Sequence, residues 1–385
     1  MEDFLLLENQ FSEEEKLIRD AVQRFVNEQA LPLIPDAYEQ GCFPEKLIPD
    51  LAKLGVLGMT LPEQYGGSNA SYVAYGLACQ ELEKGDSGLR SFVSVQTSLC
   101  MFPIFTYGTE EQRQRYLPPM ARGELIGCFG LTEPDIGSDP AHMKTHARKV
   151  TDGWVLNGSK LWITNATIAD LAIVWAKTDA GVRGFIVEKE NPGLQRRDIH
   201  HKLALRASST GELVLQDCWV PDSHYLPGSD KGLAAVLGCL TQARYGVAWG
   251  VIGAAMACYE TALQYTRERQ QFGRPLASFQ LIQKDLADML TEIVKAQCVH
   301  LHLGRLKNQD LATATMISLA KMNACREALG IARLARNLLG ANGISLEYSV
   351  MRHMANLEAV FTYEGTDNIH HLILGKHITG LDAFA

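Results

Sequence analysis

The spacing of apolar residues changes twice along the chain, and this change limits the fold to three successive parts. Residues 1–125 show helical spacing after Ser12-Glu-Glu-Glu15, a sequence with the form of a capping box. Residues 126–229 carry short β-type runs separated by glycine and Asp-Gly turns. Helical spacing returns over residues 230–385, most clearly from Leu281 to Val294. We therefore predict an α+β fold with an N-terminal α-helical domain, a small all-β middle domain and a C-terminal helical domain.

Several local elements follow from the same patterns. Trp154–Leu156 and Leu161–Thr164 flank Asn157-Gly158, which predicts a strand, a tight turn and a second strand. The run Gly246–Cys258 is too short to span a bilayer, and its small residues favour a buried helix packed closely on a neighbour. Further helices are predicted over Leu47–Leu57, Ala74–Leu82, Thr313–Leu338 and Ile369–Ile378.

Composition excludes several classes of protein. The chain has 385 residues and a net charge of −8, which argues against nucleic acid or an anionic membrane as the main partner. Its nine cysteines form no C-x-x-C pair, so neither a disulfide framework nor a metal site is expected. The acidic N-terminus resembles neither a signal peptide nor a transit peptide. We expect a bacterial cytoplasmic protein, or a processed form from the mitochondrial matrix.

The segment from Phe361 to Asn368 places one carboxylate, Glu364, between an aromatic residue and a glycine. Apolar sequence on both sides predicts partial desolvation, which raises the pKa of a carboxyl group and suits a general base. The same residues also suit a simple loop, in which Thr366 caps a helix and Gly365 allows the turn. Both interpretations remain open from these residues alone.

Arg90 stands in a mostly apolar run, Gly88-Leu-Arg-Ser-Phe-Val93. A buried guanidinium needs an anionic partner, and its planar fork matches a carboxylate. The alternative is an arginine on a helix surface that pairs with Asp86 or Glu83.

Five motifs, in order, span nearly the whole chain: Phe129-Gly-Leu-Thr-Glu-Pro134 with Gly137-Ser-Asp139, Trp162-Ile-Thr164, Arg269-Gln-Gln-Phe-Gly273, Gly340-Ala-Asn-Gly343 and Tyr363-Glu-Gly-Thr366. Together they resemble the acyl-CoA dehydrogenase family. The resemblance implies a β-barrel-like middle domain between two helical domains, FAD as cofactor, and oxidation of acyl-CoA thioesters between the α and β carbons. Glutaryl-CoA dehydrogenases are the most similar subfamily, through Arg90-Ser-Phe-Val-Ser-Val-Gln96, Arg244-Tyr-Gly-Val-Ala-Trp249, Leu281-Ile-Gln-Lys284 and Ile378-Thr-Gly-Leu381.

This resemblance implies oxidation and decarboxylation of glutaryl-CoA to crotonyl-CoA and CO2, with Glu364 as the base that abstracts the α proton. Electrons would pass to an electron-transferring flavoprotein, and the chain would form a homotetramer. The alternatives are a dehydrogenase for another short-chain or dicarboxylyl acyl-CoA, or one that oxidises glutaryl-CoA without decarboxylation.

The resemblance also assigns binding residues. Substrate would contact Arg90, Ser91 and Ser94 at its carboxylate, with Glu83, Tyr363 and Gly365 around the acyl chain and Ser138, Leu237 and Arg244 along CoA. FAD would contact Phe129, Leu131, Thr132, Gly137, Ser138, Trp162, Ile163, Thr164, Arg269, Gln280, Asn337, Gly340, Ala341, Thr366 and Asn368, in part across a subunit interface.

Four of these assignments leave a structural alternative open. Trp162 either stacks on the flavin or packs in the core, and Tyr363 either shapes the pocket or simply packs. Arg244 holds a phosphate or pairs with an acidic neighbour, and Arg269 would alone be read as a surface salt bridge. The flavin loop reads Asp135-Ile136 before Gly137, which departs from the usual sequence of that loop.

Overall fold

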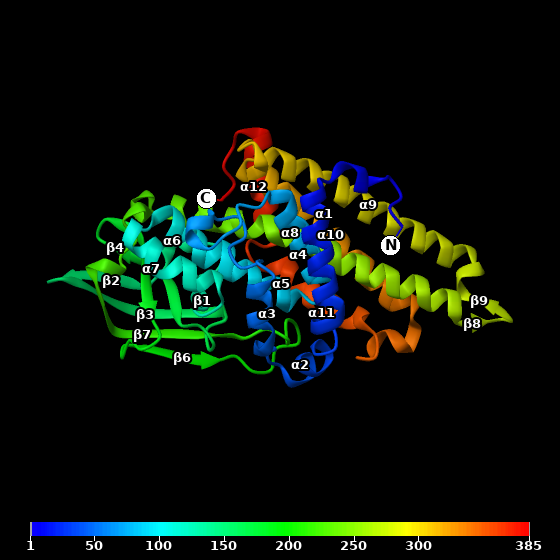
Figure 1. The fold of residues 1–385 in the computed structure, drawn as a ribbon, viewed down its shortest axis with the longest axis horizontal. Helices are drawn as coiled ribbons and strands as arrows, with labels where there is room; N and C mark the ends of the chain where they lie inside the picture. The colour runs from blue at the N-terminus through cyan, green and yellow to red at the C-terminus, as the bar shows by residue number, and fades with distance from the viewer. Residues whose placement is uncertain (1, 385) are drawn as a thin grey trace.

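The computed structural model describes residues 2–384. The molecule is elongated, with a β part at one end and long helices reaching to the other (Figure 1). The first part of the chain is helical, as its apolar spacing predicts. Its helices are α1 (Glu13–Phe25), α2 (Ile34–Gln40), α3 (Ile48–Lys53), α4 (Tyr72–Gly85), α5 (Ser87–Ser94), α6 (Phe102–Tyr107) and α7 (Glu110–Ala121).

The middle part is one mixed sheet of seven strands. Its strands are β1 (Gly127–Gly130), β2 (His146–Val150), β3 (Gly153–Thr164), β4 (Leu171–Thr178), β5 (Gly181–Glu188), β6 (Leu194–Asp198) and β7 (Thr210–Pro221). Neighbouring strands follow the order β1-β4-β2-β3-β7-β6, and β5 pairs with β4. One face packs on the helical parts, and the other encloses a small core that includes Leu156, Phe185 and Leu213.

The predicted turn at Asn157-Gly158 is wrong. Both residues lie inside the continuous strand β3, which pairs with β7 on both sides of them. The register shifts between Leu156 and Gly158, so the chain forms a bulge there instead of reversing. A Cβ at residue 158 would collide with the backbone of Thr145, and only glycine permits that approach.

The last part is a bundle of long helices. Its elements are α8 (Leu233–Glu268), a short hairpin of β8 (Gln270–Gln271) and β9 (Arg274–Pro275), α9 (Gln280–Asn308), α10 (Ala314–Leu338), α11 (Ser349–Thr362) and α12 (Asp367–Thr379). Helix α8 contains the predicted buried run and packs on both α4 and α10. It is long and apolar enough to cross a membrane, but 78% of its most apolar window is buried inside the protein, as in a core helix.

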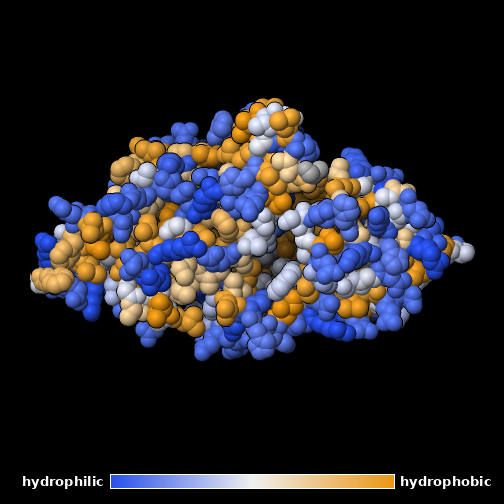
Figure 2. Space-filling model, turned by 180° about the vertical axis from the view of Figure 1, so that it is seen from behind, coloured by the Kyte–Doolittle hydropathy of each residue, from blue (hydrophilic) through white to orange (hydrophobic). Residues whose placement is uncertain are grey.

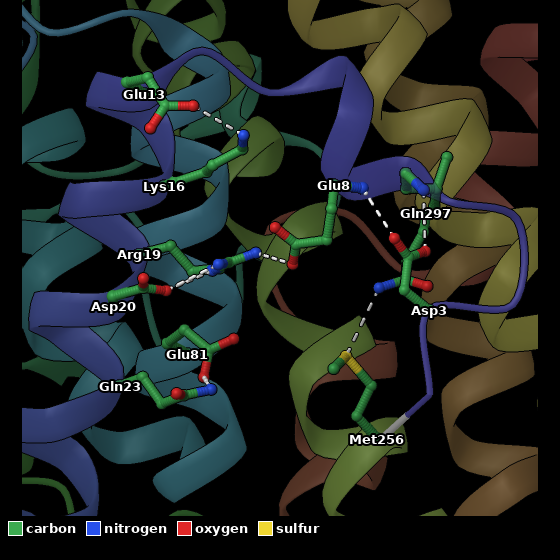
Figure 3. Close-up of polar contacts among 11 residues, drawn as sticks. Asp3, Glu8, Glu13, Lys16, Arg19, Asp20, Gln23, Glu81, Met256 and Gln297 are labelled. Carbon is green, nitrogen blue, oxygen red and sulfur yellow. Dashed lines mark hydrogen bonds and ion pairs between the residues drawn. The ribbon is translucent and has the colours of Figure 1, made fainter.

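Polar contacts connect the N-terminal segment to α1 (Figure 3). Asp3 accepts backbone N–H groups of Leu7 and Glu8, and Glu8 forms an ion pair with Arg19 of α1. Ser12 and Glu15 form the predicted capping box at the start of α1. Helix α1 in turn packs on α4, the helix that carries Glu83.

Candidate active site

A buried ion pair joins α4 and α5. Glu83 and Arg90 are both fully buried, and Arg90 Nε donates to Glu83 Oε2 at 2.5 Å. Arg90 Nη2 donates to the hydroxyl of Tyr363, which follows α11. The helix-surface alternative for Arg90 and Glu83 is therefore wrong, although the predicted pairing of these two residues is present.

Burial disfavours the charged form of Arg90, but Glu83 and Tyr363 outweigh burial and hold its pKa well above the ordinary value. Burial also raises the pKa of Tyr363, which therefore stays neutral. Within the described residues, Arg90 Nη1 and Glu83 Oε1 are buried without a hydrogen-bond partner. A buried donor of this kind is costly unless a ligand or water satisfies it, which makes Arg90 a candidate anion-binding group.

Glu364 occupies a strained turn between α11 and α12. Its φ is +53°, and the following Gly365 has φ +96°. A positive φ is unfavourable for a glutamate, and such backbone strain is typical of functional sites. Thr366 accepts the backbone N–H of Ile369 and so caps α12, as predicted. The structural interpretation of this segment is thus correct for the cap at Thr366 and the turn at Gly365. It does not account for the backbone strain at Glu364.

One oxygen of the Glu364 carboxyl group is buried, although the residue as a whole is half-buried. Its Oε2 atom is buried and has no hydrogen-bond partner among residues 2–384. Burial raises the pKa of Glu364, while Arg90, Lys321 and Arg244 oppose that rise. A poorly solvated carboxylate with one free oxygen has the properties that proton abstraction requires.

Two cations hold the backbone around Glu364. Arg244 of α8 donates from Nε to the carbonyl oxygen of Glu364 at 2.7 Å. Lys321 of α10 donates to the carbonyl oxygens of Tyr363 and Gly365, at 3.0 and 2.9 Å. Sequence reasoning missed Lys321, although it stands at helical spacing among the buried residues Ile317, Ala320 and Ala324, where a lysine is unusual.

His370 is a second residue that sequence reasoning missed. Its Nδ1 lies 2.5 Å from Ser318 Oγ, and burial lowers its pKa to about 3, so the imidazole is neutral. It packs beside Gly365, where an added Cβ would lie 3.1 Å from His370 Nε2 and from Arg244. The turn therefore has room for glycine and little else.

The other predicted substrate residues fall into two groups. Ser91 and Ser94 are buried on α5 beside Arg90, and Ser94 Oγ lacks a hydrogen-bond partner within the described chain. Leu237 near the start of α8 and Ser138 in the loop after β1 are exposed. This distribution matches an inner pocket for the anionic end of a ligand and an outer surface for its remainder.

The predicted flavin residues of the β part lie on two adjoining segments. Phe129 and Leu131 are buried at the end of β1, and the carbonyl oxygen of Thr132 accepts the N–H of Leu161 in β3 at 2.8 Å. Trp162 is 58% exposed and has φ +63°, so its core-packing alternative is wrong. An exposed indole held on a strained bulge fits stacking against a planar ring. Ile163 is buried, Thr164 is half-buried, and Gly137 is exposed.

A second set of predicted flavin residues lies far from the first. Arg269 and Gln280 flank the β8–β9 hairpin, which Figure 1 places at the end of the molecule opposite the sheet. Asn337, Gly340 and Ala341 are exposed at the end of α10 and in the turn after it. One chain does not bring these five residues to Trp162. Thr366 and Asn368 lie instead at the start of α12, beside the Glu364 turn.

The face seen in Figure 2 is hollowed near the middle of the molecule, and hydrophobic residues are visible inside the hollow. Helix α5, which carries Arg90, also lies near the middle of the molecule (Figure 1).

Comparison with known proteins identifies the family. Residues 12–124, 128–218 and 230–379 match the N-terminal, middle and C-terminal domains of acyl-CoA dehydrogenases. The chain therefore belongs to the acyl-CoA dehydrogenase family, and its helix–sheet–helix architecture is the fold of that family.

Among solved structures, the chain is similar to glutaryl-CoA dehydrogenase from Mycobacterium smegmatis, with 51% identity, 98% of each chain covered and a TM-score of 0.97. A glutaryl-CoA dehydrogenase from the same organism in complex with FADH2 is 48% identical, with 100% and 99% of the two chains covered and a TM-score of 0.98. Human mitochondrial short-chain specific acyl-CoA dehydrogenase is 33% identical over 371 residues, which cover 95% of this chain and 90% of the human protein.

Proposed function

We propose that this chain catalyses the FAD-dependent oxidation and decarboxylation of glutaryl-CoA to crotonyl-CoA and CO2. One observation carries the choice of substrate: Arg90 is fully buried, keeps an unpaired Nη1 donor within the described residues, and is one of the charges that act on Glu364. The similarity to glutaryl-CoA dehydrogenases supports the same substrate.

The free carboxylate of the substrate binds Arg90. Nε and Nη2 already serve Glu83 and Tyr363, which leaves Nη1 for the ligand. Ser94, one helical turn further along α5, adds a buried hydroxyl without a partner in the described structure. A charge-assisted hydrogen bond in such surroundings contributes about 1.5–3 kcal/mol.

Glu364 removes the α proton of the thioester. Its raised pKa strengthens it as a base, and its free Oε2 can accept the proton. FAD, when bound, would supply the hydride acceptor for the β carbon. The flavin ring would lie against the exposed Trp162 and the backbone of Phe129, Leu131 and Thr132. These residues lie on two adjoining segments, so they can contact one ring together.

Loss of CO2 then depends on two side-chain carboxyl groups, those of Glu83 and Glu364. Oxidation gives glutaconyl-CoA, whose carboxylate lies on Arg90 close to the charge of Glu83. Like charges in a buried site destabilise the carboxylate, so departure of neutral CO2 is favoured. The C–C bond breaks, its electron pair enters the dienolate, and protonated Glu364 returns its proton to the γ carbon. The product is crotonyl-CoA.

A distal set of residues would contact the FAD of a neighbouring subunit, because within a single chain these residues lie far from Trp162. The set is Arg269, Gln280, Asn337, Gly340 and Ala341. Such contacts would require an oligomer, and the family resemblance implies a homotetramer. Gly137 and Ser138 would lie near the pyrophosphate and CoA, and Arg244 and Leu237 would line the CoA path. The reduced cofactor would pass its electrons to an electron-transferring flavoprotein.

Product mass after reaction of the FAD-loaded protein with glutaryl-CoA and an artificial electron acceptor tests this proposal. Crotonyl-CoA is the expected product. Glutaconyl-CoA would retain the oxidation and remove the decarboxylation. Unchanged glutaryl-CoA, together with oxidation of butyryl-CoA, would overturn the role of Arg90.

A second candidate is a short-chain acyl-CoA dehydrogenase, and the 33% identity to the human short-chain enzyme favours it. The same mass measurement with butyryl-CoA distinguishes the two. A butyryl group would leave Arg90 Nη1 without a partner, so we expect its turnover to be much slower than that of glutaryl-CoA.

A further inference from the structure

Lys321 lies where it can act on the Glu364 turn without touching a substrate. It is 1% exposed, and its ammonium group reaches the turn from α10, a different helix from those that carry Arg90 and Arg244. Two of its three N–H donors serve the carbonyl oxygens before and after Glu364. Arg244 serves the carbonyl between them. Three successive carbonyl oxygens of one strained turn are therefore bound by two buried cations.

We propose that Lys321 is a positioning residue that holds Glu364 in its left-handed conformation and places a positive charge beside the turn. The inference rests on the proposed role of Glu364 as the base. It concerns a residue that contacts only the backbone of the turn, so its effect is separable from that of the base.

The geometry gives the positioning part of this role. The turn lies between the end of α11 and the capped start of α12, so α-helical hydrogen bonds hold neither Glu364 nor Gly365. A glutamate at φ +53° reverts to an ordinary conformation unless its surroundings prevent rotation. Rotation of either peptide next to Glu364 would take a carbonyl oxygen away from Lys321 and leave a buried ammonium group with fewer partners.

The surrounding charges give the electrostatic part. Burial raises the pKa of Glu364, and three cations from three helices lower it again. Burial lowers the pKa of Lys321, while the carboxylates of Glu364 and Asp367 support its charge. The titratable and charged groups that face the turn are Arg90 on α5, Glu83 on α4, Arg244 on α8, Lys321 and Cys325 on α10, and Tyr363, Asp367 and His370 on the chain around the turn. Of these cations only Arg90 and Arg244 are expected to meet substrate, which leaves Lys321 as the cation with a purely internal role.

The test compares Lys321→Met with the parent protein, both loaded with FAD. The readout without substrate is the infrared band of a protonated carboxyl group, assigned to Glu364 by its disappearance in Glu364→Gln and titrated against pH. The readout with substrate is the acid limb of kcat/KM for glutaryl-CoA. Removal of the Lys321 charge raises the pKa of Glu364, so we expect both midpoints to move to higher pH by about one unit or more. Turnover at neutral pH should fall, because a smaller fraction of Glu364 is then ionised.

Arg326→Met is the matched control. Arg326 also lies on α10 and contacts the start of α12, but it binds the side chain of Asp367 at 2.8 Å instead of the carbonyl oxygens of the turn. It should leave both midpoints unchanged. Lys321→Arg, which keeps the charge and the donors, should keep the infrared midpoint close to that of the parent.

Should Lys321→Met fail to fold, Lys321→Gln keeps two N–H donors without a charge and gives the same titration. Unchanged midpoints in the variant that folds would overturn the inference and leave the proposed function intact. Full turnover by Glu364→Gln would instead overturn Glu364 as the base, and the infrared midpoint would still decide whether Lys321 governs this carboxyl group.

Discussion

Replacement of Gly250 by alanine tests whether the Arg90–Glu83 pair selects the substrate. Gly250 lies in α8, directly against this pair. A Cβ at this position would lie less than 3.0 Å from Glu83 Oε2, 3.0 Å from Arg90 Nε and 3.1 Å from Arg90 Cδ. The methyl group therefore has to displace one or both members of a fully buried ion pair.

The expected effect on stability follows from overpacking. Forcing one extra carbon into a close-packed core costs about 1–3 kcal/mol. The Glu83 side chain cannot simply swing away, because it is fully buried and its movement separates the ion pair. We therefore expect a lower melting temperature but a folded protein that still binds FAD.

The expected effect on catalysis is larger for one substrate than for another. If Arg90 loses its alignment, the charge-assisted hydrogen bond to the substrate carboxylate is lost, at about 1.5–3 kcal/mol. Because about 1.4 kcal/mol corresponds to a factor of ten, kcat/KM for glutaryl-CoA should fall by roughly ten- to hundredfold. The kcat/KM for butyryl-CoA, which has no carboxylate, should change by much less.

The assay is kcat/KM for both acyl-CoA substrates with an artificial electron acceptor, for the parent and Gly250→Ala. Gly330→Ala is the control, because a Cβ at this position in α10 meets no atom within 4 Å. The control should keep both rates and gain about 0.5–1 kcal/mol of stability. An unchanged ratio of the two kcat/KM values in a folded Gly250→Ala protein would refute the assignment of Arg90 and Glu83 to substrate selection.

Three further predictions concern single residues. Glu364→Gln should bind FAD and acyl-CoA but lose turnover by at least about 100-fold, measured by single-turnover reduction of the cofactor; near-normal reduction would contradict the base assignment. His370 has a pKa of about 3 in the folded protein, below its ordinary value of 6.5, so the unfolded chain binds more protons between these values and stability falls as pH decreases from about 6.5 to 3. His370→Gln should remove about 1.4 kcal/mol per pH unit of that slope in urea unfolding, and an equal slope in both proteins would exclude a buried neutral imidazole. Lys160→Met should cost about 3–5 kcal/mol in the same assay, because it leaves Glu133 buried without the cation that lies 2.9 Å away, and Glu133→Gln in addition should recover part of the loss.

Most of the architecture was predictable from the sequence because its determinants are local. The capping box at Ser12 and the apolar stripe from Leu281 to Val294 act over a few residues, and both predictions are confirmed. The prediction of a turn at Asn157-Gly158 was wrong because a glycine within a strand pattern is compatible with either a chain reversal or a bulge. The chain forms a bulge because β3 pairs with β7, a strand distant in sequence, on both sides of these residues.

The site was predictable only where its motifs resemble a known family. Glu364 and Arg90 stand in such motifs, and the structure places them in one buried cluster. Lys321 and Ser318 stand in an ordinary helical stretch, 43 and 46 residues before Glu364, and no local pattern shows that α10 packs beside the turn. The requirement for glycine at position 250 is likewise invisible until α4, α5 and α8 are packed together.

The charge balance of this cluster bears on the choice between the two candidate substrates. Three basic side chains, Arg90, Arg244 and Lys321, act on Glu364, while Glu83 is the other carboxylate among the groups that act on it most strongly. When both carboxylates are ionised, the cluster keeps one positive charge in a buried region, and His370 adds none because it is neutral. A glutaryl group would bring one negative charge to Arg90 and neutralise the cluster, whereas a butyryl group would leave the excess charge unpaired. Because an unpaired buried charge is strongly unfavourable, this balance supports a dicarboxylyl thioester as the substrate. If Glu364 is the base, proton transfer to Glu364 would restore the single positive charge, which would hold the carboxylate of the oxidised thioester near Arg90.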